Sequence, residues 1–421
     1  MKSLIANSIA KSSKFLVEKL KLGKGSALPG RVALAIDKNF LAGFNKKFES
    51  GKYNFFLTGT NGKTTSSGIL SSIVMAASSK APISNAFGAN LYYGIASEFV
   101  NSSALDLDLD TSDFVLELDE AAFRLVAKDL KPKSVVVTNI FRDQLDRFGE
   151  LNATQELIAE GIKAIGDKEV DVLLNANDKK VVELKELLPE NFNKIFYKVE
   201  NVDIAFKEST DKLEVNENIF YAKLLARKVD GSQIELGFGK DSTEAFLPIA
   251  GDFNVYNACA AAAAAYHAGI CLEDIKTGIE SYNCAFGRGE KIIYDDKELN
   301  VFLIKNPAGC TEVVNFVSQF KGSRVLIAIN DNYADGRDVS WLWDAQFENF
   351  LDKDLSFVCS GKRALDMALR LKYAGIDEKN IEVKDELIAS IKDFALKSKK
   401  DENLFVLPTY TALLEINSSF K

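Results

Sequence analysis

The stretch FFLTGTNGKTTSSGIL, residues 55–70, decides the fold. Its apolar start predicts a strand over 53–58, its two glycines predict a tight turn, and Lys63-Thr64-Thr65 opens a helix predicted over 64–77. Backbone N–H groups and the helix dipole make such a helix start favourable for an anion. The stretch therefore predicts a phosphate-binding loop between a strand and a helix.

The polar groups of this loop have expected roles in binding a nucleotide. Lys63 would neutralise the β- and γ-phosphates and act in catalysis, and the Thr64 hydroxyl would ligate Mg²⁺. The spacing departs from GxxxxGK[ST], because Leu57 stands where the first glycine would be. A glycine turn with a chance lysine is the alternative. The expected nucleotide ligands are Gly59, Thr60, Asn61, Gly62, Lys63, Thr64 and Thr65.

Strands and helices alternate along the rest of the chain, which predicts an α/β protein with a largely parallel, doubly wound sheet. Short alternating runs between residues 195 and 247 predict a small antiparallel insertion, and an Ala-rich helix follows at 251–270. The turn AFGRGE, 285–290, leads into a second α/β series. The predicted strands are 53–58, 114–118, 134–139 and 170–175, then 301–304, 324–329, 355–359 and 404–407.

Composition narrows the classes of protein. The chain has 421 residues, enough for two or three domains, and a net charge of 52 − 60 = −8, which argues against a nucleic-acid partner. The single histidine, His267, excludes a His-rich metal site and is expected to be a packed or helix-end residue. The five cysteines form no CxxC pair, so neither a zinc ribbon nor a disulfide framework is expected. A reduced, cytoplasmic compartment follows.

The first 21 residues, MKSLIANSIAKSSKFLVEKLK, scatter lysines among apolar residues at three- and four-residue spacing. This pattern predicts an amphipathic helix, and it lacks the unbroken apolar core of a secretory signal. We expect the helix to pack on its own protein. A contact with a membrane surface is the alternative.

Several segments resemble the Mur ligase superfamily, the ATP-dependent amide-bond ligases of cell-wall and polyglutamate synthesis. TGTNGKTT resembles their nucleotide loop, and Glu117 in FVLELDE stands where they bind Mg²⁺. Asn254 and Asn257 in GDFNVYNA match paired asparagines near the adenine, and Arg288 in GRGE matches a hinge arginine that reaches the phosphates on domain closure. TNIFRDQLDRFG, 138–149, matches a further loop, with Gln144 in place of a histidine.

The second α/β region resembles the C-terminal domain of the MurT family, the synthetase subunits of lipid II isoglutaminyl synthase. The resemblance implies a helical lead at 1–50, a central ATP-binding domain at 51–289 and a Rossmann-like C-terminal domain at 290–421, without an N-terminal UDP-binding domain. The segments that carry it are KNPAGCTEVV (305–314), NDNYADGRDVSWLWD (330–344), SGKRALDMALRLKYAGI (360–376) and LPTYTALLE (407–415).

Two departures from these families affect the expected chemistry. Many MurT members carry a four-cysteine zinc ribbon in the ATPase domain, but residues 195–247 contain no cysteine, so no zinc site is expected. Ordinary Mur ligases carry an Asp and a His in a DYAHNP loop, where this chain has FLIKNP, 302–307. The loss of these groups fits ammonia as the nucleophile in place of an amino acid.

An Asp-rich loop at 330–344 follows a predicted strand, the end of the sheet where α/β folds place function. The resemblance implies that one of its aspartates reaches a partner glutaminase, GatD, and orients the catalytic His of that subunit. We assign this role to Asp338, with Asp335 second. The alternative is that the aspartates cap turns and pair with Arg337. Cys310 has no second His near it in sequence, so a thiol nucleophile is unsupported.

The resemblance therefore implies an ATP- and Mg²⁺-dependent synthetase subunit that amidates the D-glutamate α-carboxylate of lipid II at the inner membrane face, through an acyl phosphate. A GatD-like glutaminase would form the heterodimer and supply ammonia. Three alternatives stay open. They are a Mur- or folylpolyglutamate-type ligase that adds an amino acid, a P-loop NTPase switch or kinase, and a non-catalytic scaffold for the glutaminase.

Overall fold

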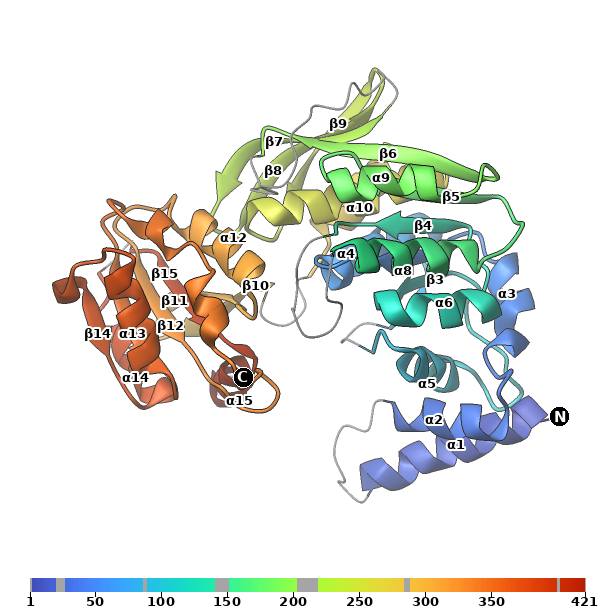
Figure 1. Cartoon of the computed structure of the whole chain (residues 1–421), viewed down its shortest axis with the longest axis horizontal. Helices are drawn as coiled ribbons and strands as arrows, with labels where there is room; N and C mark the ends of the chain where they lie inside the picture. The colour runs from blue at the N-terminus through green and yellow to red at the C-terminus, as the bar shows by residue number, and fades with distance from the viewer. Residues whose placement is uncertain are drawn as a thin grey trace. The chain divides into compact units, whose positions relative to one another are not determined.

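The computed structural model describes residues 2–19, 27–85, 89–140, 151–202, 219–283, 288–399 and 402–420. The chain divides into two compact units (Figure 1). Unit 1 contains Met1–Ala226, Ser232–Pro248 and Phe253–Tyr282, and unit 2 contains Arg227–Gly231, Ile249–Asp252 and Asn283–Lys421.

A nine-stranded sheet in the order β2-β3-β1-β4-β5-β6-β7-β8-β9 forms the centre of unit 1. From β2 to β7 each pair of neighbouring strands is parallel, as strand–helix–strand crossovers require. The four strands predicted for this half are confirmed. The first strands are β1 (Asn54–Thr58), β2 (Ile83–Ser84), β3 (Phe114–Glu117), β4 (Ser134–Val137) and β5 (Val170–Asn175).

The prediction of a small antiparallel insertion at 195–247 is confirmed for the end of that range and wrong for its start. β6 (Phe192–Glu200) pairs in parallel with β5, and β7 (Phe220–Lys228) pairs in parallel with β6. At the end of the sheet, β8 (Gly231–Phe238) pairs in antiparallel fashion with β9 (Asp241–Leu247), as predicted. The reason for the parallel pairing of β6 is another crossover helix, α9 (Lys179–Leu187), which returns the chain to the same sheet edge in the same direction.

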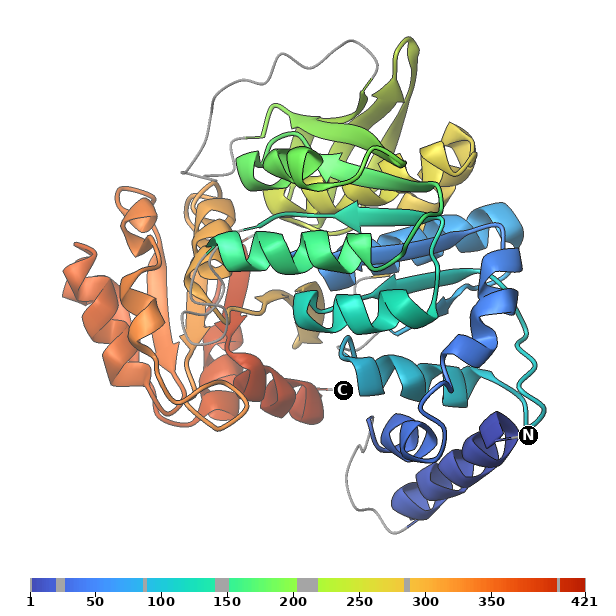
Figure 2. The ribbon, with the colours of Figure 1, turned by 45° about the vertical axis from the view of Figure 1, so that its right-hand side comes forward.

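Helices cover both faces of this sheet (Figures 1 and 2). On one face Phe56 and Phe114 share a core with Phe123 of α6 (Glu120–Asp129) and Ile158 of α8 (Leu151–Lys163). On the other, α4 (Lys63–Ser78) packs against α11 (Leu272–Glu280). The Ala-rich helix α10 (Asp252–His267) is buried from Asn254 to Ala265, because its small residues allow close approach on every side.

The segment before β1 is helical. α1 (Lys2–Lys19) contacts α2 (Leu28–Ile36) and α5 (Tyr92–Ser102), and η1 (Ala42–Phe44) and α3 (Asn45–Ser50) lead into β1. These helices belong to unit 1, and α1 and α2 lie at the end of that unit away from β6–β9 (Figures 1 and 2). In the described ranges, no helix combines the length and the apolar character that a membrane crossing needs.

Unit 2 is built on a six-stranded sheet in the order β10-β11-β15-β12-β13-β14, parallel except for the β10–β11 hairpin. Three of the four strands predicted here are confirmed, the one predicted at 301–304 instead spans 297–302, and β10 and β14 were missed. Its strands are β10 (Arg288–Tyr294), β11 (Lys297–Phe302), β12 (Arg324–Ala328), β13 (Ser356–Ser360), β14 (Ile381–Val383) and β15 (Leu404–Pro408), and its helices are α12 (Pro307–Val317), α13 (Ala364–Tyr373), α14 (Leu387–Leu396), α15 (Tyr410–Phe420) and the short η2 (Ser340–Trp343), η3 (Phe347–Phe350) and η4 (Glu378–Asn380).

The turn predicted at 285–290 is corrected at its end, because β10 already begins at Arg288. The reversal lies at the other end of β10, where Asp295 and Asp296 both have positive φ, 50° and 58°, between the paired residues Tyr294 and Lys297. Two consecutive positive φ values produce the turn whose twist matches that of the flanking strands.

Candidate active site

The phosphate loop predicted from residues 59–62 joins β1 to α4, which begins at Lys63. β1 lies between β3 and β4, so the loop stands at the carboxyl end of a central parallel strand. The helix prediction over 64–77 is confirmed, and the loop has the strand–turn–helix geometry that binds phosphate at a helix N-terminus. Thr64 is partly exposed in the first turn, whereas Thr65 is buried.

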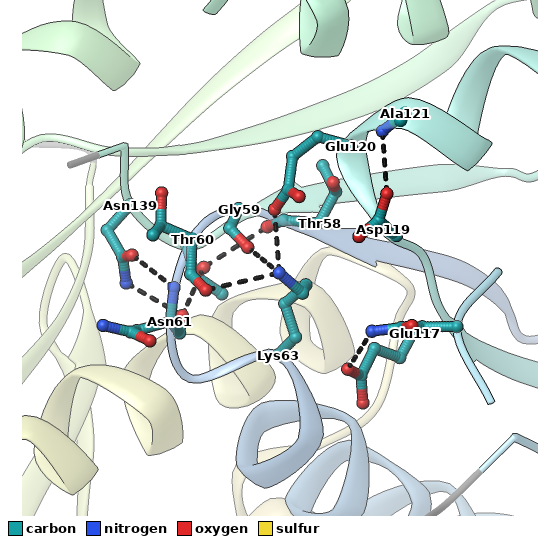
Figure 3. Close-up of polar contacts among 12 residues, drawn as sticks. Thr58, Gly59, Thr60, Asn61, Lys63, Glu117, Asp119, Glu120, Ala121 and Asn139 are labelled. Atoms are coloured by element: carbon teal, nitrogen blue, oxygen red, sulfur yellow. Dashed lines mark hydrogen bonds and ion pairs between the residues drawn. The ribbon is translucent and has the colours of Figure 1, made fainter. Parts of the chain in front are cut away.

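The loop is held in shape by the segment that follows β4. The Asn61 N–H donates to Asn139 Oδ1 at 2.8 Å, and Asn139 Nδ2 donates back to the Asn61 carbonyl at 3.0 Å (Figure 3). The Thr60 N–H donates to the Asn139 carbonyl at 2.9 Å, and Thr138 Oγ1 donates to the Asn61 carbonyl at 2.8 Å. The sequence indicated a loop at 138–149 through its resemblance around Gln144, and the role of Thr138 and Asn139 was missed.

Both loop glycines are required by their surroundings. Gly59 has φ 122°, and a Cβ there would stand 2.4 Å from Thr138 Oγ1. Gly62 has φ 82°, and its Cβ would stand 2.0 Å from Asn257 Oδ1. Of the two asparagines predicted on α10, Asn257 therefore meets the loop. Asn257 Nδ2 donates to Asn254 Oδ1 at 3.0 Å, which orients the carboxamide that lies against Gly62.

Lys63 forms a nearly buried ion pair with a residue that sequence reasoning missed. Its Nζ donates to Glu120 Oε1 at 2.8 Å and to the Thr60 carbonyl at 3.3 Å, and it also bonds the Gly59 carbonyl (Figure 3). The Lys63 and Glu120 side chains are only 12% and 7% exposed. Glu120 opens α6 directly after its N-cap Asp119, so the FVLELDE stretch supplied a signal in its last residue.

Glu117 is the candidate Mg²⁺ ligand. Its carboxylate lies at the end of β3 and is 3% exposed, and Oε1 accepts a hydrogen bond from Asn90 Nδ2 at 3.1 Å. Oε2 is buried without a hydrogen-bond partner. A buried carboxylate oxygen without a partner is costly unless a cation completes it, and Mg²⁺ takes oxygen ligands from one or two carboxylates plus substrate phosphates. The residues present therefore fit the ion.

A site built from one carboxylate and a hydroxyl differs from a protein-only metal cluster. Over the ranges that the structure describes, no three His, Cys, Asp or Glu side chains group closely enough to hold an ion by themselves. Mg²⁺ at Glu117 would therefore depend on a bound nucleotide for its remaining ligands.

Asp335 and Asp338, the two aspartates of the 330–344 loop for which we expect a role toward the partner glutaminase, have different surroundings. Asp335 is engaged within the unit: Oδ1 accepts from the Thr411 N–H at 2.7 Å, and Oδ2 accepts from the Asn332 N–H at 3.2 Å and from the Thr411 hydroxyl. Asp338 is exposed and is bonded locally by Ser340, whose N–H donates to its Oδ1 at 2.8 Å. That bond lowers the pKa of the Asp338 carboxyl.

Asp331 of the same loop bears on the alternative in which these aspartates cap turns and pair with Arg337. Asp331 pairs with Arg363 at 2.8 Å, and this is not the partner that the alternative named. In the described ranges no ion pair of the exposed Arg337 is found. Arg288 is the first residue of β10, but its side chain lies outside the described residues, as does Gln144.

The remaining candidates are inert. His267 ends α10, where burial lowers the pKa of its half-buried imidazole, and its ring meets the Phe238 ring edge-on at 5.6 Å. Burial raises the pKa of the Cys310 thiol, so the thiolate that a nucleophile needs is disfavoured. The first observation agrees with the packed or helix-end role expected for His267, and the second gives no support to a thiol nucleophile at Cys310.

The fold and the site together define a class: a nucleotide-binding α/β unit of the Mur ligase type, followed by a second α/β unit. Residues 57–265 match the Mur ligase middle domain, and residues 303–413 match the MurT ligase C-terminal domain. The chain belongs to the MurT family within the Mur ligases, which are ATP-dependent ligases.

Relatives match almost end to end. The MurT subunit of lipid II isoglutaminyl synthase (glutamine-hydrolyzing) from Streptococcus pneumoniae is 31% identical, over 99% of this chain and 96% of the relative. The subunit of the same name from Staphylococcus aureus is 32% identical, over 94% of each chain.

Solved structures agree on the fold. MurF from Acinetobacter baumannii aligns with a TM-score of 0.70 at 20% identity, over 92% of this chain and 79% of that one. Folylpolyglutamate synthase from Mycobacterium tuberculosis aligns with a TM-score of 0.61 at 14% identity, over 91% and 94%. The expected Mur-ligase-like architecture is thereby confirmed.

Proposed function

We propose that this chain is the synthetase subunit of a glutamine-dependent amidotransferase that converts the D-glutamate α-carboxylate of lipid II to the carboxamide. The observation that carries the proposal is the nucleotide loop, in which Lys63 lies beside Glu120 and the buried Glu117 Oε2 has no hydrogen-bond partner. The chain that contains this loop matches subunits of lipid II isoglutaminyl synthase over nearly its whole length. The proposed compartment is the cytoplasm, with the acceptor at the inner face of the membrane.

The first half-reaction activates the acceptor. A carboxylate resists attack by ammonia because it is negative and its oxide is a poor leaving group. Its oxygen therefore attacks the γ-phosphorus of ATP, a P–O bond to the β-phosphate breaks, and ADP leaves with that electron pair. The loop N–H groups, Lys63 and Arg288 hold and neutralise the phosphates during transfer.

Lys63 can bind the phosphates only if its ammonium leaves the groups that it bonds in this structure. In the structure its ammonium is held by Glu120 and two loop carbonyls. A triphosphate carries more negative charge than one carboxylate and brings it to the same place, so ATP competes for the ammonium. Glu120 then keeps Lys63 extended along the loop while no nucleotide is bound.

Mg²⁺ would be held by Glu117 and Thr64, and when bound it neutralises charge on the triphosphate. Asn90 fixes the Glu117 carboxylate through Oε1, which leaves Oε2 as the available ligand. Zinc has no role in this proposal.

The second half-reaction needs free ammonia. Its nitrogen attacks the acyl carbon, the bond to the phosphoryl oxygen breaks, phosphate leaves, and the nitrogen loses a proton. Ammonium predominates at neutral pH, so a sheltered source is required. The only histidine of the chain is packed against Phe238. A GatD-like glutaminase is therefore proposed as the second subunit of a heterodimer, and exposed Asp338 as the group that orients its histidine.

The decisive experiment is mass spectrometry of lipid II after incubation with ATP and the chain, in three parallel reactions. With glutamine and the glutaminase subunit, or with ammonium alone, a mass change of one carboxylate to carboxamide is expected. Glutamine without the partner should give none. Ligation of a free amino acid would instead support the Mur-type alternative, and nucleotide hydrolysis indifferent to acceptor would support an NTPase.

A further inference from the structure

Over residues 2–15, the part of α1 whose side chains the structure describes, the large apolar side chains face outward, which is not expected of a helix that only packs on its own protein. The buried positions are small or polar: Ala6, Asn7 and Ala10 are each 0% exposed. The large residues point outward, with Leu4 40%, Ile5 49%, Ile9 47% and Phe15 63% exposed. An ordinary surface helix has the opposite distribution.

The orientation of α1 is fixed by specific contacts. Asn7 Nδ2 donates to the Ala104 carbonyl at 2.7 Å, and Asn7 Oδ1 accepts from Ser103 Oγ at 3.2 Å. Ser3 Oγ donates to the Asp37 carboxylate next to the end of α2. A rotation that buried Ile5 and Ile9 would break these bonds and expose Asn7, so these two side chains keep facing outward.

The outward residues form one stripe with lysines at its edges. At about 100° per residue, Leu4, Ile5, Ile9 and Phe15 fall within an arc of about 140°. Lys11 lies about 20° beyond one edge and Lys2 about 20° beyond the other. Between the apolar residues stand only Ser8 and Ser12 among the side chains that the structure describes, and both are exposed.

The charge of this segment favours one kind of occupant. Residues 1–21 contain five lysines and one glutamate, a balance of 5 − 1 = +4, whereas the whole chain has −8. Two copies of such a helix would repel each other. An apolar face with lysines along its borders suits a bilayer surface, where acyl chains accept the apolar groups and anionic headgroups accept the cations.

We propose that α1 is an interfacial helix that lies flat on an anionic lipid bilayer, with Leu4, Ile5, Ile9 and Phe15 inserted at the headgroup boundary. Helix α1 alone carries this inference, which goes beyond the amidation chemistry. The surface would keep the subunit beside any lipid-linked acceptor.

The test is flotation of the full chain with vesicles of phosphatidylcholine and phosphatidylglycerol, or of phosphatidylcholine alone. The chain should float with the anionic vesicles, and added salt should weaken binding because it screens the lysines. The variant Ile5→Gln/Ile9→Gln/Phe15→Gln should lose about tenfold or more in partitioning, since each buried methylene contributes to membrane affinity. Failure of the unchanged chain to float would overturn the proposal.

A matched control removes three exposed leucines elsewhere in unit 1, Leu105→Gln/Leu125→Gln/Leu225→Gln, which are 64%, 48% and 40% exposed. This variant should float like the unchanged chain, and an equal loss would overturn the assignment to α1. Both variants should keep the unfolding temperature, because every changed side chain faces outward. Lys2→Gln/Lys11→Gln should weaken binding to anionic vesicles only.

Light scattering on the same samples tests the alternative that the outward face of α1 binds a second copy of the chain. A dimer that dissociates in the α1 variant, together with absent flotation, would assign the face to a second copy and overturn the membrane proposal. Because the vesicles contain neither lipid II nor nucleotide, failure here leaves the amidation proposal standing, and failure of amidation leaves this one standing.

Discussion

The carboxamide oxygen of Asn257, on α10, lies 2.0 Å from the point where a Cβ on Gly62 would stand. A helix that follows the phosphate loop by nearly two hundred residues therefore determines which residue the loop can contain. Asn254 holds that carboxamide in place by accepting from its Nδ2 at 3.0 Å. The loop and α10 act as one preorganised surface at the carboxyl end of β1.

Gly62→Ala should therefore damage nucleotide binding beyond the cost of its backbone conformation. A left-handed non-glycine residue costs about 1–2 kcal/mol, and the clash with Asn257 adds to this. We expect at least about a tenfold loss of ATP affinity in calorimetry. The matched control is Gly166→Ala, where φ is 93° and no atom lies within 4 Å of the new Cβ. Equal unfolding losses and unchanged ATP affinity in both variants would contradict the contact.

Lys63→Ala should abolish ATP-dependent amidation while the complex with the glutaminase still forms. It should also destabilise the nucleotide-free chain by about 2–3 kcal/mol, because Glu120 would remain buried without its cation. Addition of Glu120→Gln should restore part of that stability and none of the activity. Denaturant unfolding and the amidation assay separate the two effects.

The control for this pair is Lys185→Ala, because Lys185 forms an exposed ion pair with Glu186 at 3.4 Å. Its loss should change stability by less than about 1 kcal/mol. If Lys63→Ala retained amidation, its assigned role would be refuted.

Asp335→Asn and Asp338→Asn should have different effects although they lie three residues apart. Asp335→Asn replaces an acceptor of three hydrogen bonds and should cost about 1–3 kcal/mol in unfolding free energy. Asp338→Asn should leave stability unchanged and lower glutamine-dependent amidation, with ammonium-dependent amidation spared. Equal loss of both activities in Asp338→Asn would rule out a role toward the partner.

Glu312 should make unit 2 less stable as the pH rises. Burial on α12 and then the charge of Asp252 raise the pKa of Glu312 from 4.5 to about 7. A raised carboxyl pKa means that the folded state prefers the protonated form, so this stabilisation is complete below pH 4.5 and is lost as the pH rises through 7. Glu312→Gln should gain roughly 1–2 kcal/mol at pH 8 relative to the unchanged chain, with almost no gain at about pH 4. Thermal unfolding at both values measures this, and a gain that did not vary with pH would contradict it.

Metal analysis of the purified chain should find no stoichiometric zinc. The expectation rests on the absence of cysteine from residues 195–247. Stoichiometric zinc that resists dialysis would contradict it.

Glu117→Gln should raise the Mg²⁺ concentration that amidation needs, because it removes the charge of the buried carboxylate proposed to bind the ion.

The local part of the site was predictable and the long-range part was not. The strand, glycine turn and helix start of residues 55–70 are dictated by neighbours in sequence, so β1, the loop and α4 followed from the pattern. Asn139 and Glu120 meet the loop only because parallel strands bring their carboxyl ends to one edge. Family resemblance supplied Asn257 and Glu117, whereas the Lys63–Glu120 pair was missed although Glu120 is the last residue of the FVLELDE stretch.

The part of the prediction at 195–247 that is wrong, the pairing of β6 and β7, has a similar cause. Alternating apolar and polar residues identify strands such as β8 correctly, but alternation does not specify the strand with which each one pairs. The crossover through α9 decides that β6 joins β5 in parallel. Likewise, Asp335 and Asp338 look equivalent in sequence, and only the fold brings Thr411 to the first of them.

Unit 2 is assembled from three separate stretches of chain, two of which precede residue 283. Ala250, 2% exposed, belongs to the same core as Phe302 and Ile304, and Asp252 bonds Arg227 twice at 2.7 Å. A recombinant fragment that started at residue 283 would lack these pieces and present an apolar gap to water. Chimaeras that exchange C-terminal halves between relatives should therefore carry residues 227–231 and 249–252 along with the half that they complete.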